Sequence, residues 1–143
     1  MTTATLPVVS SSSSSKGLRI ALSIAQALLG VMFFMVGLMK TFQPLEAIGA
    51  SLPWVLEYPA ALTRFIGISE LAAGVGLVLP GLLRIKPFLV PLAAAGLVVV
   101  MILAAGFHAL RGEFGAIPMN LVLGGLAAFI AWGRHKKAPI ASR

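Results

Sequence analysis

The chain has 143 residues, of which 59% are hydrophobic and 10% are charged, and its mean hydropathy is +1.01. A soluble domain carries about 25% charged residues, so a water-soluble fold would have too few polar side chains to cover its surface. These proportions exclude a cytosolic enzyme and predict an integral membrane protein. The net charge of +7 would suggest a nucleic-acid partner in a soluble protein. Here the basic residues lie at the ends of apolar stretches, so they indicate membrane topology and we expect no nucleic acid.

The sequence contains no cysteine. This excludes disulfides, cysteine-ligated metals, c-type haem and thiol redox chemistry. The two histidines, His108 and His135, are predicted to lie at opposite membrane faces and so cannot form a bis-histidine haem site. One histidine and one glutamate without cysteine make a weak ligand set for a metal. We therefore expect neither haem nor metal to be held by protein ligands.

The chain begins with a polar segment, residues 1–17, that contains six consecutive serines. A serine run has no apolar surface to bury, so this segment is predicted to be disordered. The apolar run that follows, Ile20–Met39, is 20 residues long and lacks a small-residue cleavage pattern. Because the apolar part of a secretory signal peptide has about 7–15 residues, the run predicts an uncleaved first transmembrane helix.

Four such apolar stretches form a predicted transmembrane domain of residues 18–135. Their approximate bounds are 20–40, 62–79, 88–108 and 117–132. Pro80-Gly81 is expected to stop the second stretch. Pro118 lies in the first turn of the fourth, where proline is tolerated. A basic C-terminal tail, residues 136–143, completes the chain.

Basic residues lie mainly on the side of the membrane that holds both termini. The eight on this side are Lys16, Arg19, Arg84, Lys86, Arg134, Lys136, Lys137 and Arg143. The opposite side has three, Lys40, Arg64 and Arg111. Since cytoplasmic loops carry an excess of Lys and Arg, both termini are predicted to be cytoplasmic. The predicted fold is therefore an all-α, integral membrane four-helix bundle with both termini in the cytoplasm.

The longest loop, residues 41–61, is predicted to lie outside the cytoplasm. With Trp54, Tyr58 and several aliphatic residues it is too apolar for a free loop. Because Trp and Tyr favour the membrane–water boundary, we expect a short interfacial or re-entrant segment. Prolines 44, 53 and 59 are expected to break this segment. A plain surface loop is the alternative.

Small residues recur at helical spacing in each predicted helix, and each small-residue face also carries a polar group. The four sets are Gln26, Gly30, Phe33, Gly37 and Lys40; Thr63, Gly67, Glu70 and Gly74; Ala94, Leu97, Met101, Ala105 and His108; and Asn120, Gly124, Ala127 and Ala131. Such spacing keeps residues on one face of a helix. Because helices in lipid pack through small residues, these faces are predicted to meet inside the bundle.

The polar members gather in the outer half of the predicted bundle, where they form a candidate ligand-binding site. Its residues are Lys40, Arg64, Glu70, His108 and Asn120. Lys40, Arg64 and His108 each also fit an interfacial side chain, and Asn120 fits a hydrogen bond between helices. Glu70 is the strongest candidate, since a carboxylate in mid-span is costly unless it is paired and usually marks a site. Its partner is either Lys40 or Arg64, with Lys40 the more natural one, and a purely structural ion pair is the alternative.

Two segments carry a family resemblance. Residues 37–40 (GLMK) and 64–71 (RFIGISEL), with His108 near the end of the third helix, resemble the DoxX/DoxD-like family of small four-helix bacterial membrane proteins. The resemblance covers most of residues 20–133. It implies a bacterial inner-membrane location and a link to quinone-linked sulfur oxidation or redox-stress complexes. It also points to Lys40, Arg64, Glu70 and His108 as family positions.

The sequence is interpreted as a redox-associated membrane subunit with an outward-facing polar pocket for a quinone-like or small anionic ligand. Quinone carbonyls accept hydrogen bonds from Lys, Arg or His while the quinone tail lies in lipid. No residues are present to hold an electron-carrying centre, so any redox step needs a bound cofactor or a redox partner protein, and no catalytic residue is assigned. Two alternatives stay open. One is a small transporter or permease that works as a homodimer with Glu70 titrating, and the other is a structural or assembly factor without catalysis.

Overall fold

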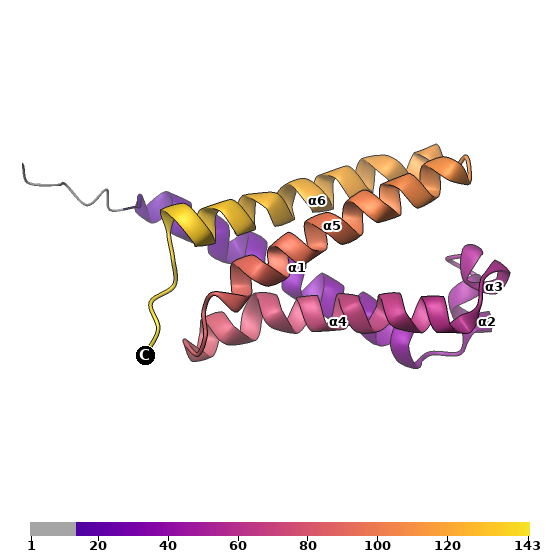
Figure 1. Cartoon of the computed structure of the whole chain (residues 1–143), viewed down its shortest axis with the longest axis horizontal. Coiled ribbons are helices and arrows are strands. Elements are labelled where there is room, and N and C mark those ends of the chain that lie inside the picture. The colour runs from indigo at the N-terminus through magenta and orange to yellow at the C-terminus, as the bar shows by residue number, and fades with distance from the viewer. Residues whose placement is uncertain (1–13) are drawn as a thin grey trace, which may run out of the picture.

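The computed structural model describes residues 14–143, and within this range the chain is helical with no strand. The four long helices are α1 (Lys16–Phe42), α4 (Ala60–Leu83), α5 (Leu89–Leu110) and α6 (Ile117–Trp132) (Figure 1). The short elements are α2 (Leu45–Gly49), α3 (Trp54–Glu57), a 3₁₀ turn (Phe114–Ala116) and a π-helical turn (Gly133–Lys137) that continues α6. The all-α prediction is confirmed.

The helices begin or end beyond the predicted spans at several points. α1 begins at Lys16, because the side chain of Ser15 accepts a hydrogen bond of 3.2 Å from the Leu18 amide and caps the helix. The predicted disordered segment 1–17 is therefore helical from residue 16 onward, while residues 1–13 lie outside the described part of the chain. The basic C-terminal tail is also helical at its start, since residues 136 and 137 belong to the π-helical turn.

The expectation that Pro80-Gly81 stops the second span is wrong. α4 passes through Pro80 and ends at Leu83. A proline forfeits one backbone hydrogen bond of a helix, and α4 continues for less than one turn beyond it. Arg84 then ends the helix in the left-handed conformation, with φ of 55°.

The apolar loop between α1 and α4 is folded and is not a plain surface loop. Prolines 44, 53 and 59 directly precede α2, α3 and α4, so they start helices where the sequence predicted breaks. Proline suits this place because the first amides of a helix need no partner within it. Ile48, Trp54 and Val55 form a buried cluster against which Phe107 of α5 packs. The loop is thereby anchored on the end of the bundle.

α1 packs most extensively against α4, and α5 packs mainly against α6. The predicted small-residue faces of α1 and α4 are both buried, from Gln26 to Lys40 and from Thr63 to Gly74. Their glycines bring the backbones together: a Cβ atom added to Gly74 would lie 2.6 Å from the Phe34 amide nitrogen. Small residues allow this approach without lost packing, as is usual for helices in lipid. In α6 the prediction holds less well, because of its four predicted face residues only Ala127 is fully buried.

Large apolar side chains cover the outside of the bundle. Leu28, Phe65 and Leu103 are each more than 65% exposed. Four segments are long and apolar enough to cross a membrane: α1, α4, α5, and α6 together with its flanking turns, Phe114–Lys137. Such a surface is stable only against lipid, so the four-helix transmembrane prediction is confirmed in its number of spans.

The two ends of the bundle differ, and we name them by what they hold. The terminal end carries the start of α1, the turn from α4 to α5 and the end of α6; the loop end carries α2, α3 and the turn from α5 to α6 (Figure 1). At the loop end, α5 and α6 diverge from α4 (Figure 1). Polar side chains at this end are consequently divided between two places.

Candidate functional site

The first polar group at the loop end is an ion pair between α1 and α4. Lys40 Nζ lies 2.9 Å from Glu70 Oε1, and the two residues are 8% and 4% exposed. Lys40 stands in the last turn of α1, whereas Glu70 is ten residues into α4, roughly 15 Å along its axis. Gly67, one turn before Glu70, makes room for the lysine, since an added Cβ there would lie 2.7 Å from Lys40 Cβ. The structure thus assigns Lys40 as the partner of Glu70.

Arg64 joins this group through the backbone. Its Nη1 donates a hydrogen bond of 2.7 Å to the carbonyl oxygen of Lys40, and no ion pair links it to Glu70. This carbonyl belongs to the last turn of α1, where carbonyl groups lack partners within the helix and carry a partial negative charge. Arg64 therefore caps α1 from the first turn and a half of α4, and so holds the lysine backbone in place.

Two atoms on the buried face of α4 lack hydrogen-bond partners. They are Glu70 Oε2 and Thr63 Oγ1, and Thr63 is fully buried. Residues seven apart share a helix face, so both atoms lie on the side of α4 that faces α1. A buried polar atom without a partner is costly, and its presence in a native structure calls for an explanation. We call Lys40, Thr63, Arg64 and Glu70 the α1–α4 site.

His108 lies in a second polar group, formed by the α5–α6 turn and α3. Its Nδ1 is 2.7 Å from Glu113 Oε2, while Arg111 binds Glu113 Oε1 at 2.8 Å. Arg111 also donates hydrogen bonds of 2.7 and 3.0 Å to the two carboxylate oxygens of Glu57 in α3. The same guanidinium lies 5.7 Å from the Tyr58 ring centroid. The sequence analysis used Arg111 only in the count of basic residues, and it missed that Arg111 holds α3 on α5 through Glu57 and Glu113.

These contacts shift the acidity of both carboxyl groups. The hydrogen bond from Arg111 lowers the pKa of Glu57 below its ordinary value of 4.5. For Glu113, the hydrogen bond with His108 and then that with Arg111 lower the pKa in the same direction. The same bonds raise the pKa of Arg111, which stays charged at every relevant pH. Glu57, Arg111 and Glu113 therefore form a charged network at neutral pH.

Asn120, the fifth predicted site residue, makes no side-chain hydrogen bond to the other four. It lies in the first turn of α6, and its Nδ2 is buried with no partner. The five predicted residues thus occupy three places: Lys40, Arg64 and Glu70 are joined, His108 is bonded to Glu113, and Asn120 stands apart.

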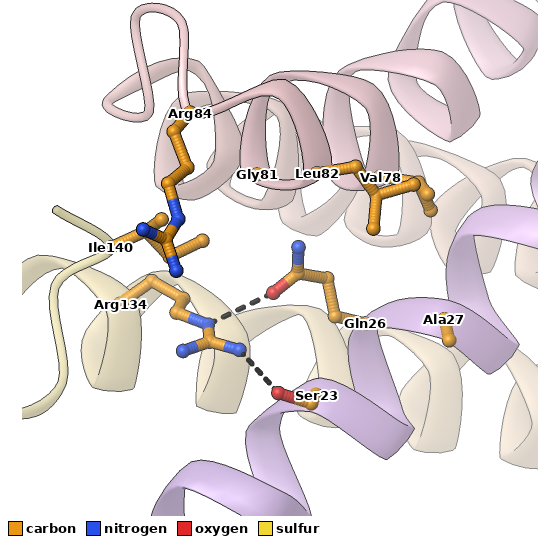
Figure 2. Close-up of a pocket in the computed structure, with 9 residues that line it drawn as sticks. All are labelled: Ser23, Gln26, Ala27, Val78, Gly81, Leu82, Arg84, Arg134 and Ile140. Carbon is orange, nitrogen blue, oxygen red and sulfur yellow. Dashed lines mark hydrogen bonds between the residues drawn. The ribbon is translucent and has the colours of Figure 1, made fainter. Parts of the chain in front are cut away.

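A third polar group lies at the terminal end, far along the helices from the α1–α4 site. Arg134, in the π-helical turn, donates to Gln26 Oε1 and Ser23 Oγ of α1, each at 2.9 Å (Figure 2). The sequence placed Gln26 on the interior face of the first helix, but it used Arg134 only in the count of basic residues. Arg134 and Gln26 are 108 positions apart in the sequence, so no spacing pattern could have connected them.

The described residues, 14–143, contain no group of three or more His, Asp or Glu side chains that could hold a metal ion. What they do contain is four lipid-facing helices with buried polar groups at both ends. Together these features define a small multi-pass integral membrane protein with polar sites inside its helix bundle.

The family follows from comparison with known sequences. The chain belongs to the DoxX-like family, whose sequence model matches residues 24–130, from the third turn of α1 to near the end of α6. The resemblance noted in the sequence is confirmed. No curated protein and no solved structure gives a significant match to the chain.

Proposed function

We propose that this DoxX-like protein is a redox-associated membrane subunit that binds a quinone-type head group at the α1–α4 site. The observation that carries the proposal is the second carboxylate oxygen of Glu70. It is buried inside a membrane-spanning helix, next to a charged lysine, and lacks a hydrogen-bond partner. Ionisable groups inside a membrane are costly and usually mark a ligand or proton pathway.

The donors and acceptors of the site fit both forms of such a ligand. Lys40 has three N–H groups and uses one on Glu70, and the Thr63 hydroxyl is free to donate. These groups suit a quinone carbonyl. Glu70 Oε2 suits the hydroxyl of the reduced form, because an ionised carboxylate only accepts. When bound, a quinone supplies two-electron, two-proton chemistry, while Glu70 provides a place to hold one proton and Arg64 keeps the end of α1 in position.

The proposal includes a location. We place both termini in the cytoplasm of a bacterium and the protein in the inner membrane, so that the α1–α4 site lies in the outer half of the bilayer. Eight basic residues at the terminal end against three at the loop end support this orientation. Electrons would reach a bound quinone from a partner protein at the loop end.

A structural role is the second candidate, and the packing around the ion pair supports it. Gly67 and Gly74 bring α4 into contact with the backbone of α1 on either side of Glu70. Such packing leaves little room beside the pair. In this candidate function the pair fixes the register of α1 against α4, and the protein acts as an assembly factor.

Binding of a short-chain quinone to the purified protein distinguishes the two functions. Thr63→Val removes the free hydroxyl and should weaken quinone binding about tenfold, the usual effect of losing one such hydrogen bond. Ser69→Ala is the matched control, since that hydroxyl is one residue from Glu70 but already bonds the Phe65 carbonyl. Thermal stability measured with and without ubiquinone-1 and menadione gives the affinities, and mass spectrometry of co-purified lipids identifies the natural ligand. If neither quinone binds, and Thr63→Val and Ser69→Ala respond equally to added quinone, the quinone site is contradicted and the structural role is supported.

A further inference from the structure

The terminal end holds a cavity of about 280 Å³ that the proposed quinone site does not use. Its polar lining consists of Ser23 and Gln26 from α1, Arg84 from the end of α4 and Arg134 from the π-helical turn. Figure 2 shows the Arg84 side chain extending toward Arg134, whose guanidinium is directed to Gln26 and Ser23 of α1. Three elements distant in sequence therefore meet around two cations.

No acidic residue balances these charges. The chain has four Asp or Glu residues, all glutamates, at positions 46, 57, 70 and 113. The last three are paired with cations elsewhere, and none of the ion pairs among residues 14–143 includes Arg84 or Arg134. Arg134 is only 9% exposed. A buried cation without a counter-charge is strongly unfavourable, so an anion from outside the chain would stabilise this cavity.

Arg134 is held in a fixed position with donors to spare. Three of its N–H groups bond Gln26, Ser23 and the Ala138 carbonyl. A guanidinium has five N–H groups in a rigid plane, so two remain for a ligand. Planar, paired donors match the oxygens of a phosphate or carboxylate group. The π-helical turn, a feature that often marks functional sites, places this guanidinium inside the bundle.

The remaining walls are apolar and formed in part by Val78, Leu82 and Ile140. Ile140 belongs to the segment that follows the π-helical turn. A hydrogen bond of 3.1 Å from the Arg143 amide to the Arg84 carbonyl holds this segment in place. The cavity thus combines a cationic centre with an apolar rim near the ends of the membrane-spanning helices. Basic pockets of this kind between transmembrane helices bind lipid head groups.

We propose that this cavity is an anion-binding site for a phosphate group, held between Arg134 and Arg84. The phosphate is carried either by an anionic phospholipid, whose chains would lie against the apolar rim, or by a water-soluble phosphate compound. Arg134 supplies two fixed donors inside the cavity, and Arg84 closes over the group from the exposed side. The site is separate from the α1–α4 site and does not depend on quinone binding.

The test uses the full-length protein in a neutral detergent and three probes: dioctanoyl phosphatidylglycerol, dioctanoyl phosphatidylcholine and inorganic phosphate. The Kd of each is obtained from the shift in unfolding temperature. Phosphatidylglycerol should bind at least about tenfold more tightly than phosphatidylcholine if a lipid is the source, because the choline head group cancels the phosphate charge. Inorganic phosphate alone should give the shift if the source is water-soluble. Binding of neither anion would overturn the proposal.

Arg84→Gln is the first variant, because Arg84 is exposed and its loss should leave the fold intact. It should weaken anion binding about tenfold. Lys136→Gln is the matched control, since Lys136 is an exposed cation at the same end that does not line the cavity. Arg134→Lys keeps the charge but removes the planar donors, and should weaken binding further. Equal losses in Arg84→Gln and Lys136→Gln would show general charge attraction and overturn the proposal.

Discussion

Lys40 Nζ, at the end of α1, lies 2.9 Å from Oε1 of Glu70, in the middle of α4. The other ion pairs among residues 14–143 join side chains of the loops and helix ends at the loop end. Because both members of the pair are buried, neither charge is solvated when its partner is removed. The stability of the α1–α4 interface therefore depends on the charge of the Glu70 carboxylate and on what is bound to it.

A double-mutant cycle on this pair should show strong coupling. Glu70→Gln leaves the Lys40 ammonium buried without a counter-charge, and stranding such a charge costs about 3–5 kcal/mol. Adding Lys40→Met should recover part of that loss, because the remaining groups are then neutral. The free energies are measured by denaturant titration in mixed micelles.

The corresponding cycle with Arg64 is the control. Arg64 bonds the Lys40 carbonyl and not the carboxylate, so Arg64→Met and Glu70→Gln should be close to additive. Coupling in the Arg64 cycle and additivity in the Lys40 cycle would contradict the assigned partner.

Glycine substitutions should separate the α1–α4 interface from the lipid-facing surface. Gly74→Ala places a methyl group 2.6 Å from the Phe34 backbone nitrogen, and such overpacking costs about 1–3 kcal/mol. Gly96→Ala meets no atom within 4 Å and should be neutral or slightly stabilising, since alanine favours a helix more than glycine. Thermal unfolding of the two variants checks this, and an equal effect at both positions would contradict the close approach.

Acidification should release α3 from α5. The folded pKa values of Glu57 and Glu113 lie below the ordinary 4.5, so their contribution is present above pH 4.5 and is lost as the pH falls through the folded values. Trp54, which packs edge-on against Phe107 at a centroid distance of 5.5 Å, should then become more exposed. Its fluorescence, measured in a Trp132→Phe background, should shift to longer wavelength as the pH falls below 4.5.

The double variant Glu57→Gln with Glu113→Gln isolates these two groups. It should show the longer-wavelength emission already at neutral pH and a flatter pH dependence. Glu46→Gln is the control, because Glu46 is exposed and forms no ion pair among the described residues. An unchanged pH profile in the double variant would rule out the network as the source.

Topology reporters test the proposed orientation. A fusion after Arg134 should report the cytoplasm, and insertions within residues 50–57 should report the opposite side, because the basic residues gather at the terminal end. Each position is tested with two reporters, one active only inside the cytoplasm and one active only outside it, so that each reporter is the control for the other. A C-terminus outside the cytoplasm would place the α1–α4 site in the inner half of the bilayer.

The sequence by itself determined the fold class, the number of spans and the buried faces of the first two helices. Apolar length and small-residue spacing are local properties, and in lipid they are enough to define a helix and the face it packs with. For this reason the faces from Gln26 to Lys40 and from Thr63 to Gly74 are found buried as predicted. The segments 37–40 and 64–71 likewise carried the resemblance to the DoxX-like family.

The tertiary structure decided which polar groups meet. Helical spacing leaves the rotation and pairing of helices open, so it favoured Lys40 over Arg64 as the partner of Glu70 without deciding between them, and it did not foresee that His108 bonds Glu113. Nor could it place Arg134, whose contacts with Gln26 and Ser23 depend on the return of α6 to α1 and on a widened final turn. Hydrogen bonds and ion pairs form only within about 3–4 Å, and that proximity is set by how the helices pack and not by where residues stand along the chain.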